Sequence, residues 1–99
     1  MQFPIAGFDW DAGNREKCCK HGVSIAEIEA LFGGNVRVAP DLAHSQREDR
    51  LIAVGRTAAG RPIFVVFTLR QVKGSLLVRP VTARSMHGKE IERYEAKGS

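Results

Sequence analysis

The chain has 99 residues, of which 43% are hydrophobic, and it carries a formal net charge of +4 at pH 7. This length makes one domain with a modest core, which we expect to occupy residues 1–99. No apolar run approaches the ~18 residues of a membrane span, and the first residues lack the basic start and apolar stretch of a signal peptide, so we expect no membrane association.

The first half of the chain predicts two helices, which follow a short apolar strand over residues 8–10. Asp11 is a good N-cap for a helix over about 12–20, and Gly22 suits the left-handed position beyond its end. Ser24 and Glu27 form the capping box of a second helix, whose apolar residues fall on one face. The glycine pair at 33–34 ends that helix.

The rest of the chain predicts a sheet and a last helix. Turn residues at 59–60 and 73–74 separate three runs rich in Val, Ile, Leu and Phe, which suggests a meander. Pro62 and Pro80 lie inside two of the runs, so each predicts a sheet edge or a bulge. Ser85 is the expected N-cap of a helix that runs to about Ala96. The expected strands are Val36–Ala39, Arg50–Arg56, Arg61–Leu69 and Ser75–Ala83.

These elements predict an α+β fold. Two N-terminal helices and one C-terminal helix pack on a twisted antiparallel sheet of about four to five strands. The adjacent Cys18 and Cys19 fall on a predicted helix, where neighbouring side chains point about 100° apart, so a disulfide between them is geometrically poor. A reducing cytoplasm is therefore the expected location.

Charge is distributed unevenly along the chain. Residues 1–49 carry five basic and eight acidic side chains, a net charge of −3, whereas residues 50–99 carry ten and three, a net charge of +7. Between Arg50 and Lys89 there are eight Lys or Arg residues and no Asp or Glu. Such asymmetry indicates an anionic partner, either nucleic acid or an anionic membrane.

A series of short motifs runs along nearly the whole chain. In the first half these are FDWD at 8–11 with Asn14, KHGVS at 20–24 with Glu27, Phe32, and Asp41 with HS at 44–45. In the second half they are Glu48, Arg50, Gly55, Thr68 with Arg70, TAR at 82–84, and MHGKE at 86–90 with Tyr94. In this order and spacing the chain resembles the BrnT family of toxins from bacterial type II toxin–antitoxin systems. Many members have an alanine after the TAR-like stretch, where this chain has Met86-His87, which leaves the role of His87 open.

The resemblance implies a RelE/ParE-like fold and a ribonuclease activity that acts on RNA and inhibits translation. It also implies neutralisation by a BrnA-like antitoxin that itself carries the DNA-binding segment, so operator DNA would be bound only through the antitoxin. By family analogy, the expected complex is a heterotetramer of two toxins and two antitoxins.

Metal-free cleavage of RNA needs a base for the 2′-OH, cations around the phosphorane and an acid for the 5′-oxygen. The sequence shows no metal-binding constellation of a nuclease, because His21, His44 and His87 are far apart and the carboxylates avoid the basic half. We therefore expect no metal or other cofactor. The 2′-OH would be the nucleophile and the product a cyclic phosphate.

Three arginines are the first candidates for the catalytic site. Arg84 ends the last strand, where a RelE-like sheet has a phosphate-binding arginine, and a guanidinium donates two parallel hydrogen bonds to a phosphate. The alternative for Arg84 is an ion pair with a carboxylate such as Glu90. Arg70 ends the preceding strand, where exposure near a turn explains it almost as well. Arg50 begins another strand, where a local ion pair with Glu48 or Asp49 is the alternative. We expect the guanidinium groups of separate strands to converge on one concave face that holds the scissile phosphodiester.

The other candidates are supported less by the sequence. Lys20 and His21 end the first helix, where its dipole alone favours cations. His87 near the start of the last helix has the titration range of an acid–base catalyst, but an exposed histidine is the ordinary case there. Tyr94 could stack on a base of RNA. Arg56 and Arg61 flank a hairpin turn, where they bind phosphates non-specifically or keep the loop soluble.

Two other functions are compatible with the same residues. The basic field could belong to a nucleic-acid-binding or regulatory module without catalysis. The chain could also be a ParE-like toxin that acts on a protein target.

Overall fold

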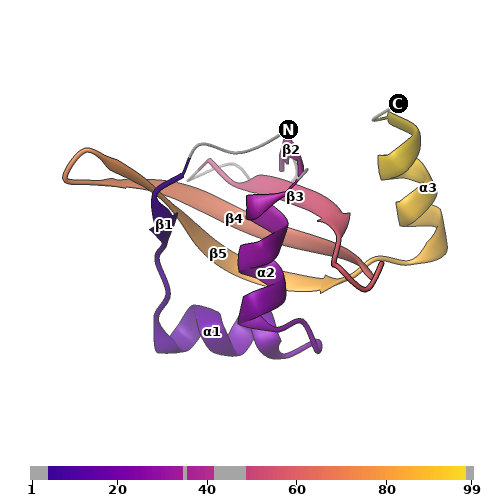
Figure 1. Ribbon diagram of the computed structural model, residues 1–99, viewed down its shortest axis with the longest axis horizontal. Helices are drawn as coiled ribbons and strands as arrows, with labels where there is room; N and C mark the ends of the chain where they lie inside the picture. Colours follow the sequence, from indigo (N-terminus) through magenta and orange to yellow (C-terminus); the bar gives the residue numbers. More distant parts are fainter. Residues whose placement is uncertain (1–4, 35, 42–48, 98–99) are drawn as a thin grey trace.

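The computed structural model describes residues 5–34, 36–41 and 49–97 (Figure 1). It has the α+β class that the sequence predicts. The elements in chain order are β1 (Gly7–Phe8), α1 (Ala12–Cys19), α2 (Ile25–Gly33), β2 (Arg37–Pro40), β3 (Leu51–Arg56), β4 (Pro62–Val72), β5 (Ser75–Ser85) and α3 (Gly88–Lys97). None of the helices in the described part of the chain is long and apolar enough to cross a membrane.

The five strands form one sheet in the order β1-β5-β4-β3-β2. Strands β3 to β5 are antiparallel neighbours, which confirms the predicted meander, and β2 pairs antiparallel with β3. The sheet is mixed rather than wholly antiparallel, because β1 pairs in parallel with β5 through Gly7↔Leu77 and Phe8↔Val78. Strand β1 has only two residues, too few to show an alternation of polar and apolar side chains. The direction of its pairing is therefore set by the course of the chain through the elements that follow.

The starts of the first two helices are capped as predicted. The Asp11 carboxylate accepts a hydrogen bond from the Asn14 N–H at 2.8 Å, and the Asn14 side chain accepts one from the Asp11 N–H at 2.7 Å. Ser24 and Glu27 exchange the equivalent pair of bonds at the start of α2. Gly22 between the helices has a φ of 83°, a left-handed conformation that a residue with a Cβ rarely adopts.

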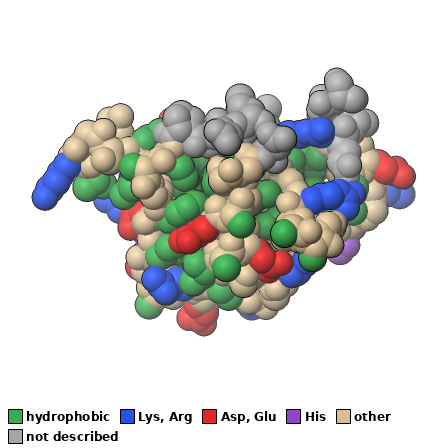
Figure 2. Space-filling model, in the orientation of Figure 1, with side chains coloured by type: hydrophobic (Ala, Val, Ile, Leu, Met, Phe, Trp, Pro, Cys, Tyr) green, Lys and Arg blue, Asp and Glu red, His purple; other side chains and the backbone are tan. Residues whose placement is uncertain are grey.

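The hydrophobic core lies between α2 and one face of the sheet, which we call the inner face (Figure 1). Ile28 and Phe32 of α2 pack with the buried side chains of β4, and the Phe32 and Phe67 rings meet edge to face with centroids 5.0 Å apart. Ile63, Val65 and Phe67 are fully buried at alternate positions of β4 and face the core, while Val66, between the last two, is also buried on the opposite face at 7% exposure. Figure 2 shows the side that carries α2, where basic side chains lie mainly toward the rim.

Of the two prolines predicted to mark a sheet edge or a bulge, Pro80 does so and Pro62 does not, because β4 lies between β3 and β5. Pro62 is the first residue of β4. Pro80 lies at a bulge of β5, because the register passes from Val66↔Thr82 to Phe67↔Pro80 and leaves Val81 as the extra residue. The hairpin between β4 and β5 is closed by Lys73 and Gly74, which both have positive φ, 52° and 81°, as a type I′ turn requires.

The predicted N-cap of the last helix is wrong. Ser85 belongs to β5, where it pairs with Ile63, and its hydroxyl accepts a hydrogen bond from Arg61 Nε at 2.9 Å. The helix begins at Gly88, because pairing with β4 extends β5 through Ser85. The carbonyl of His87 accepts the first helical bond from Ile91, and the Glu90 side chain accepts a bond from the His87 N–H at 3.1 Å.

Candidate functional site

The face of the sheet opposite α2, which we call the outer face, carries the arginines of the strands. Because Ile63, Val65 and Phe67 point to the core, the alternate residues of β4 point outward, and residues paired across antiparallel strands share a face. In β2 to β5 every arginine follows this rule and lies on the outer face: Arg37, Arg56, Arg70, Arg79 and Arg84. Arg50, immediately before β3, has the same parity as the outward residue Ile52.

The bulge at Val81 is necessary for this arrangement. Arg79 and Arg84 are five residues apart, and an odd separation in a regular strand puts two side chains on opposite faces. The extra residue restores the parity, so that Arg79 pairs with Thr68 and Arg84 pairs with Phe64, both outward residues of β4.

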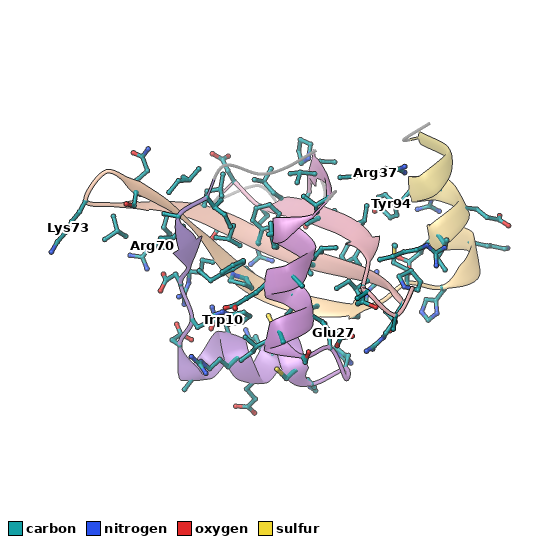
Figure 3. The ribbon with its side chains drawn as sticks, in the orientation of Figure 1. Trp10, Glu27, Arg37, Arg70, Lys73 and Tyr94 are labelled. Atoms are coloured by element: carbon teal, nitrogen blue, oxygen red, sulfur yellow. The ribbon has the colours of Figure 1, made fainter. Side chains whose placement is uncertain are left out.

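Arg70 and Arg84 share a face, as expected, but they do not share a site. Arg84 is paired with Phe64, and Arg70 lies six residues farther along β4, a distance of about 20 Å. Figure 3 shows Arg70 toward the hairpin end of the sheet and Tyr94 of α3 at the opposite end. One phosphate cannot contact both guanidinium groups, so the expected convergence of these two arginines on a single scissile group is not what the fold produces.

At the α3 end, Arg84 forms a bidentate pair with Glu90 of α3. Both of its terminal nitrogens donate to the Glu90 carboxylate, each at 2.7 Å, and the guanidinium carbon lies 4.4 Å from the centre of the Phe64 ring. The Arg84 and Glu90 side chains are 38% and 22% exposed, so the pair is accessible from solvent. The ion pair that was the alternative for Arg84 is therefore present, and its contact with the aromatic ring holds the guanidinium over the outer face.

Each member of this pair shifts the pKa of the other. Hydrogen bonds from Arg84, followed by the bond from the His87 N–H, lower the pKa of Glu90 to about 2. The hydrogen bonds to Glu90 raise the pKa of Arg84 above its usual value. His87 is exposed and lies next to this pair through its backbone, and the Tyr94 ring is 6.1 Å from that of Phe64. Arg84, Glu90, His87, Phe64 and Tyr94 form what we call the α3-end site.

Arg56 and Arg61, expected to bind RNA, both have structural contacts at this end of the sheet. Arg56 donates to the Gly60 carbonyl at 2.8 Å and so bridges the β3–β4 turn. Arg61 joins the sheet to the turn between α1 and α2, because it donates to Ser85 and, at 2.9 Å, to the carbonyl of Gly22. It also lies 3.5 Å from Glu27.

Lys20 and His21 are exposed and precede Gly22 in the turn that Arg61 binds. Ser85, the other partner of Arg61, pairs with the inward residue Ile63, whereas Arg84 beside it points outward. Lys20 and His21 therefore lie behind the end of the sheet rather than on the face that carries Arg84, and the fold does not bring them to the α3-end site.

At the other end of the sheet, two arginines bind the carboxylates that follow β1. Asp9 accepts from Arg70 at 2.7 Å and from Arg79 at 3.3 Å, and Arg79 also pairs with Asp11. The backbone bond from Asn14, followed by the bond from Arg79, lowers the pKa of Asp11. A cleft of about 870 Å³ opens here, lined among others by Lys17, Asp49 and Thr68. The ion pairs of Asp9 and Asp11 attach the start of α1 to β4 and β5. Arg50 also lies toward this end of the sheet, because the next residue, Leu51, pairs with Phe67.

Three side chains in the ion pairs and the ring contact of the outer face were not among the candidate site residues from the sequence, which named Glu90 only as an ion-pair partner of Arg84. Glu90 and Phe64 contact Arg84 directly, and Arg79 connects two aspartates that precede it by about 70 residues. Glu90 had a readable signal, because a glutamate three residues after a helix N-cap commonly accepts the N-cap N–H. His44, Ser45 and Glu48 lie outside the described residues. Within the described ranges, no three His, Cys, Asp or Glu residues lie close enough to hold a metal ion.

The comparison with protein families identifies one that spans most of the chain. Residues 10–90 match the family described as ribonuclease toxin, BrnT, of type II toxin–antitoxin system. The matched part includes β2 to β5 and ends at Glu90, so it contains the Arg84–Glu90 pair and leaves Tyr94 outside. A search of curated proteins finds no match.

Proposed function

Since the chain belongs to the BrnT family of ribonuclease toxins of type II toxin–antitoxin systems, we propose that it is an endoribonuclease that cleaves RNA without a metal at the α3-end site. The observation that supports this assignment is the geometry of Arg84. Its guanidinium holds a planar two-oxygen anion with two bonds of 2.7 Å, and a phosphodiester presents the same pair of oxygens.

In the proposed reaction, the scissile phosphate binds to Arg84 and the neighbouring 2′-OH attacks the phosphorus. The 5′-oxygen leaves, which gives a 2′,3′-cyclic phosphate and a 5′-OH. A guanidinium placed where negative charge develops stabilises the phosphorane, and one such group typically contributes a factor of about 10²–10³ in rate. The Phe64 ring packs against the guanidinium of Arg84 and keeps it in place, and the neighbouring Tyr94 ring is positioned to stack on a base of the RNA.

The arginines farther along the outer face then bind other phosphates of the same RNA strand. Arg70 is the most suitable, because its side chain is 54% exposed although it pairs with Asp9. We further propose that cleavage inhibits translation in the cytoplasm, that a BrnA-like antitoxin covers the outer face in a complex of two toxins and two antitoxins, and that operator DNA is bound only by the antitoxin.

The test is RNA cleavage by the purified protein in the presence of EDTA, with the wild type compared with Arg84→Ala. We expect the variant to lose about 10²–10³ in rate, with a smaller loss of affinity for RNA. Arg15→Ala is the matched control, since Arg15 is an exposed arginine of α1, and it should cleave at the wild-type rate.

Other results would point to other functions. A wild type that binds RNA without cutting it, and whose Arg84→Ala variant loses only affinity and part of the salt dependence, would be a binding module. A wild type that arrests growth while cellular RNA stays intact would act on a protein target. Loss of cleavage in EDTA, restored by a divalent cation, would contradict the metal-independent reaction.

A further inference from the structure

The carboxylate of Glu90 occupies the place on Arg84 that the proposed substrate needs. Glu90 accepts both terminal nitrogens of Arg84, and it also accepts the backbone N–H of His87 at 3.1 Å. An incoming phosphate must replace the first two of these bonds. The third bond does not depend on Arg84, so it keeps the carboxylate beside the guanidinium after the phosphate has entered.

Helix α3 holds Glu90 over the sheet through contacts that phosphate binding leaves intact. The Tyr94 ring packs on Phe64, and the Tyr94 carbonyl accepts a hydrogen bond from Arg37 of β2 at 2.6 Å (Figure 3). Glu90 belongs to the first turn of the same helix. A carboxylate displaced from Arg84 therefore stays within one side-chain length of the bound phosphate, where the attacking 2′-OH also lies.

We propose that Glu90 is the general base of the reaction: when the phosphate replaces it on Arg84, it accepts the proton of the 2′-OH. This inference rests on the proposed function. The 2′-oxygen then forms its bond to phosphorus as the bond from phosphorus to the 5′-oxygen breaks. The 5′-oxygen takes a proton from water, and Glu90 returns its proton to solvent after the products leave.

The pairing makes Glu90 a base that becomes active on substrate binding. While Arg84 holds it, its pKa is about 2, too low for efficient proton abstraction near neutral pH. Loss of the bonds to Arg84 removes the first cause of that shift and returns the pKa toward its ordinary value of 4.5. The other titratable groups that act on this pair are His87, which precedes α3, and Tyr94 on α3.

The experiment compares Glu90→Gln with Glu92→Gln, an exposed glutamate of the same helix that has no place in the site. Two quantities are measured: the single-turnover cleavage rate at saturating RNA, and the affinity for the same RNA with a 2′-O-methyl group at the cleaved position, which cannot react. Glu90→Gln should lose about 10²-fold or more in rate. Its affinity should equal or exceed that of the wild type, because Arg84 is no longer occupied. Glu92→Gln should match the wild type in both.

A second variant gives a readout that a purely structural role would not change. Formate added to Glu90→Ala should restore part of the cleavage rate in proportion to its concentration, and it should not do so for Arg84→Ala. A slow Glu90→Ala enzyme that formate does not accelerate would overturn the proposal, provided that its thermal unfolding shows a folded protein.

The outcomes separate this inference from the function on which it rests. If the wild type and Glu92→Gln both fail to cleave RNA, the proposed function fails and this inference fails with it. If both cleave and Glu90→Gln cleaves as fast or faster at saturation, the function stands but Glu90 only blocks Arg84, and the assignment as a base is wrong.

Discussion

Arg84 shows how one side chain can serve both the fold and the proposed chemistry. In the resting protein its charge is matched by Glu90, and the pair attaches α3 to β5. The same two bonds orient the guanidinium for a phosphate. The ion pair with Glu90, which the sequence offered as the alternative role of Arg84, is therefore present. A bound phosphate would have to replace this ion pair, and that exchange can be tested.

The pair should make a pH-dependent contribution to stability. The pKa of Glu90 is lowered from 4.5 to about 2 on folding, so its contribution is fully present above pH 4.5 and is lost as the pH falls toward 2. Because both side chains are partly exposed, solvent limits this contribution to about 1 kcal/mol. Glu90→Gln should therefore lower the free energy of unfolding by about that amount at pH 7 and change it little near pH 2. Denaturant unfolding at several pH values measures this difference, and a difference that is constant across the range would contradict it.

Among the elements, β5 is the one whose irregularity determines the site. Its single extra residue, Val81, lets Pro80 and Ala83 both point to the core while Arg79 and Arg84 both point outward. A regular strand could not do this, because those two arginines are an odd number of residues apart. A proline inside a strand signals such an irregularity, but it does not say which side chains the irregularity redirects.

Deletion of Val81 should abolish the native fold. Without the extra residue, either Ala83 leaves the core and Arg84 enters it, or the strand loses its pairing with β4. An unpaired buried charge costs several kcal/mol, which is a large part of the ~5–15 kcal/mol that stabilises a domain. Val81→Ala keeps the bulge and should unfold cooperatively with a small loss of stability. Circular dichroism and thermal unfolding distinguish the two variants, and a deletion variant that melts like the wild type would contradict this account of the bulge.

Across the whole molecule, the arginines of the strands lie on the outer face of the sheet, among apolar side chains that include the buried Val54 and Val66. The acidic N-terminal half compensates part of the charge of the basic half. Asp9 and Asp11 bind Arg70 and Arg79, and Glu27 lies near Arg61. The charge asymmetry of the sequence is thus partly used inside the fold. The anionic partner inferred from it must compete with these carboxylates for the same arginines.

Arg70 should therefore act in RNA affinity and not in the chemical step. It lies about 20 Å along β4 from the residue paired with Arg84, too far to reach the same phosphate. Arg70→Ala should weaken binding and reduce the slope of log affinity against log salt by about 0.7, the value for one contact to a single strand. Its single-turnover rate at saturating RNA should stay at the wild-type level. Loss of that rate at saturation would show that Arg70 acts at the scissile phosphate after all.

The sequence by itself determined the local features of this protein: the caps of the first two helices, the meander of β3 to β5, the bulge at Pro80, and the family motifs. These depend on neighbouring residues, whose spacing can be read directly. Only the tertiary structure decided that β1 pairs in parallel with β5, that Arg84 is held by Glu90, and that Arg70 lies far from it. Each of these depends on which segments far apart in the sequence lie side by side, and for the two arginines also on strand register and the extra residue of β5, which no local pattern specifies.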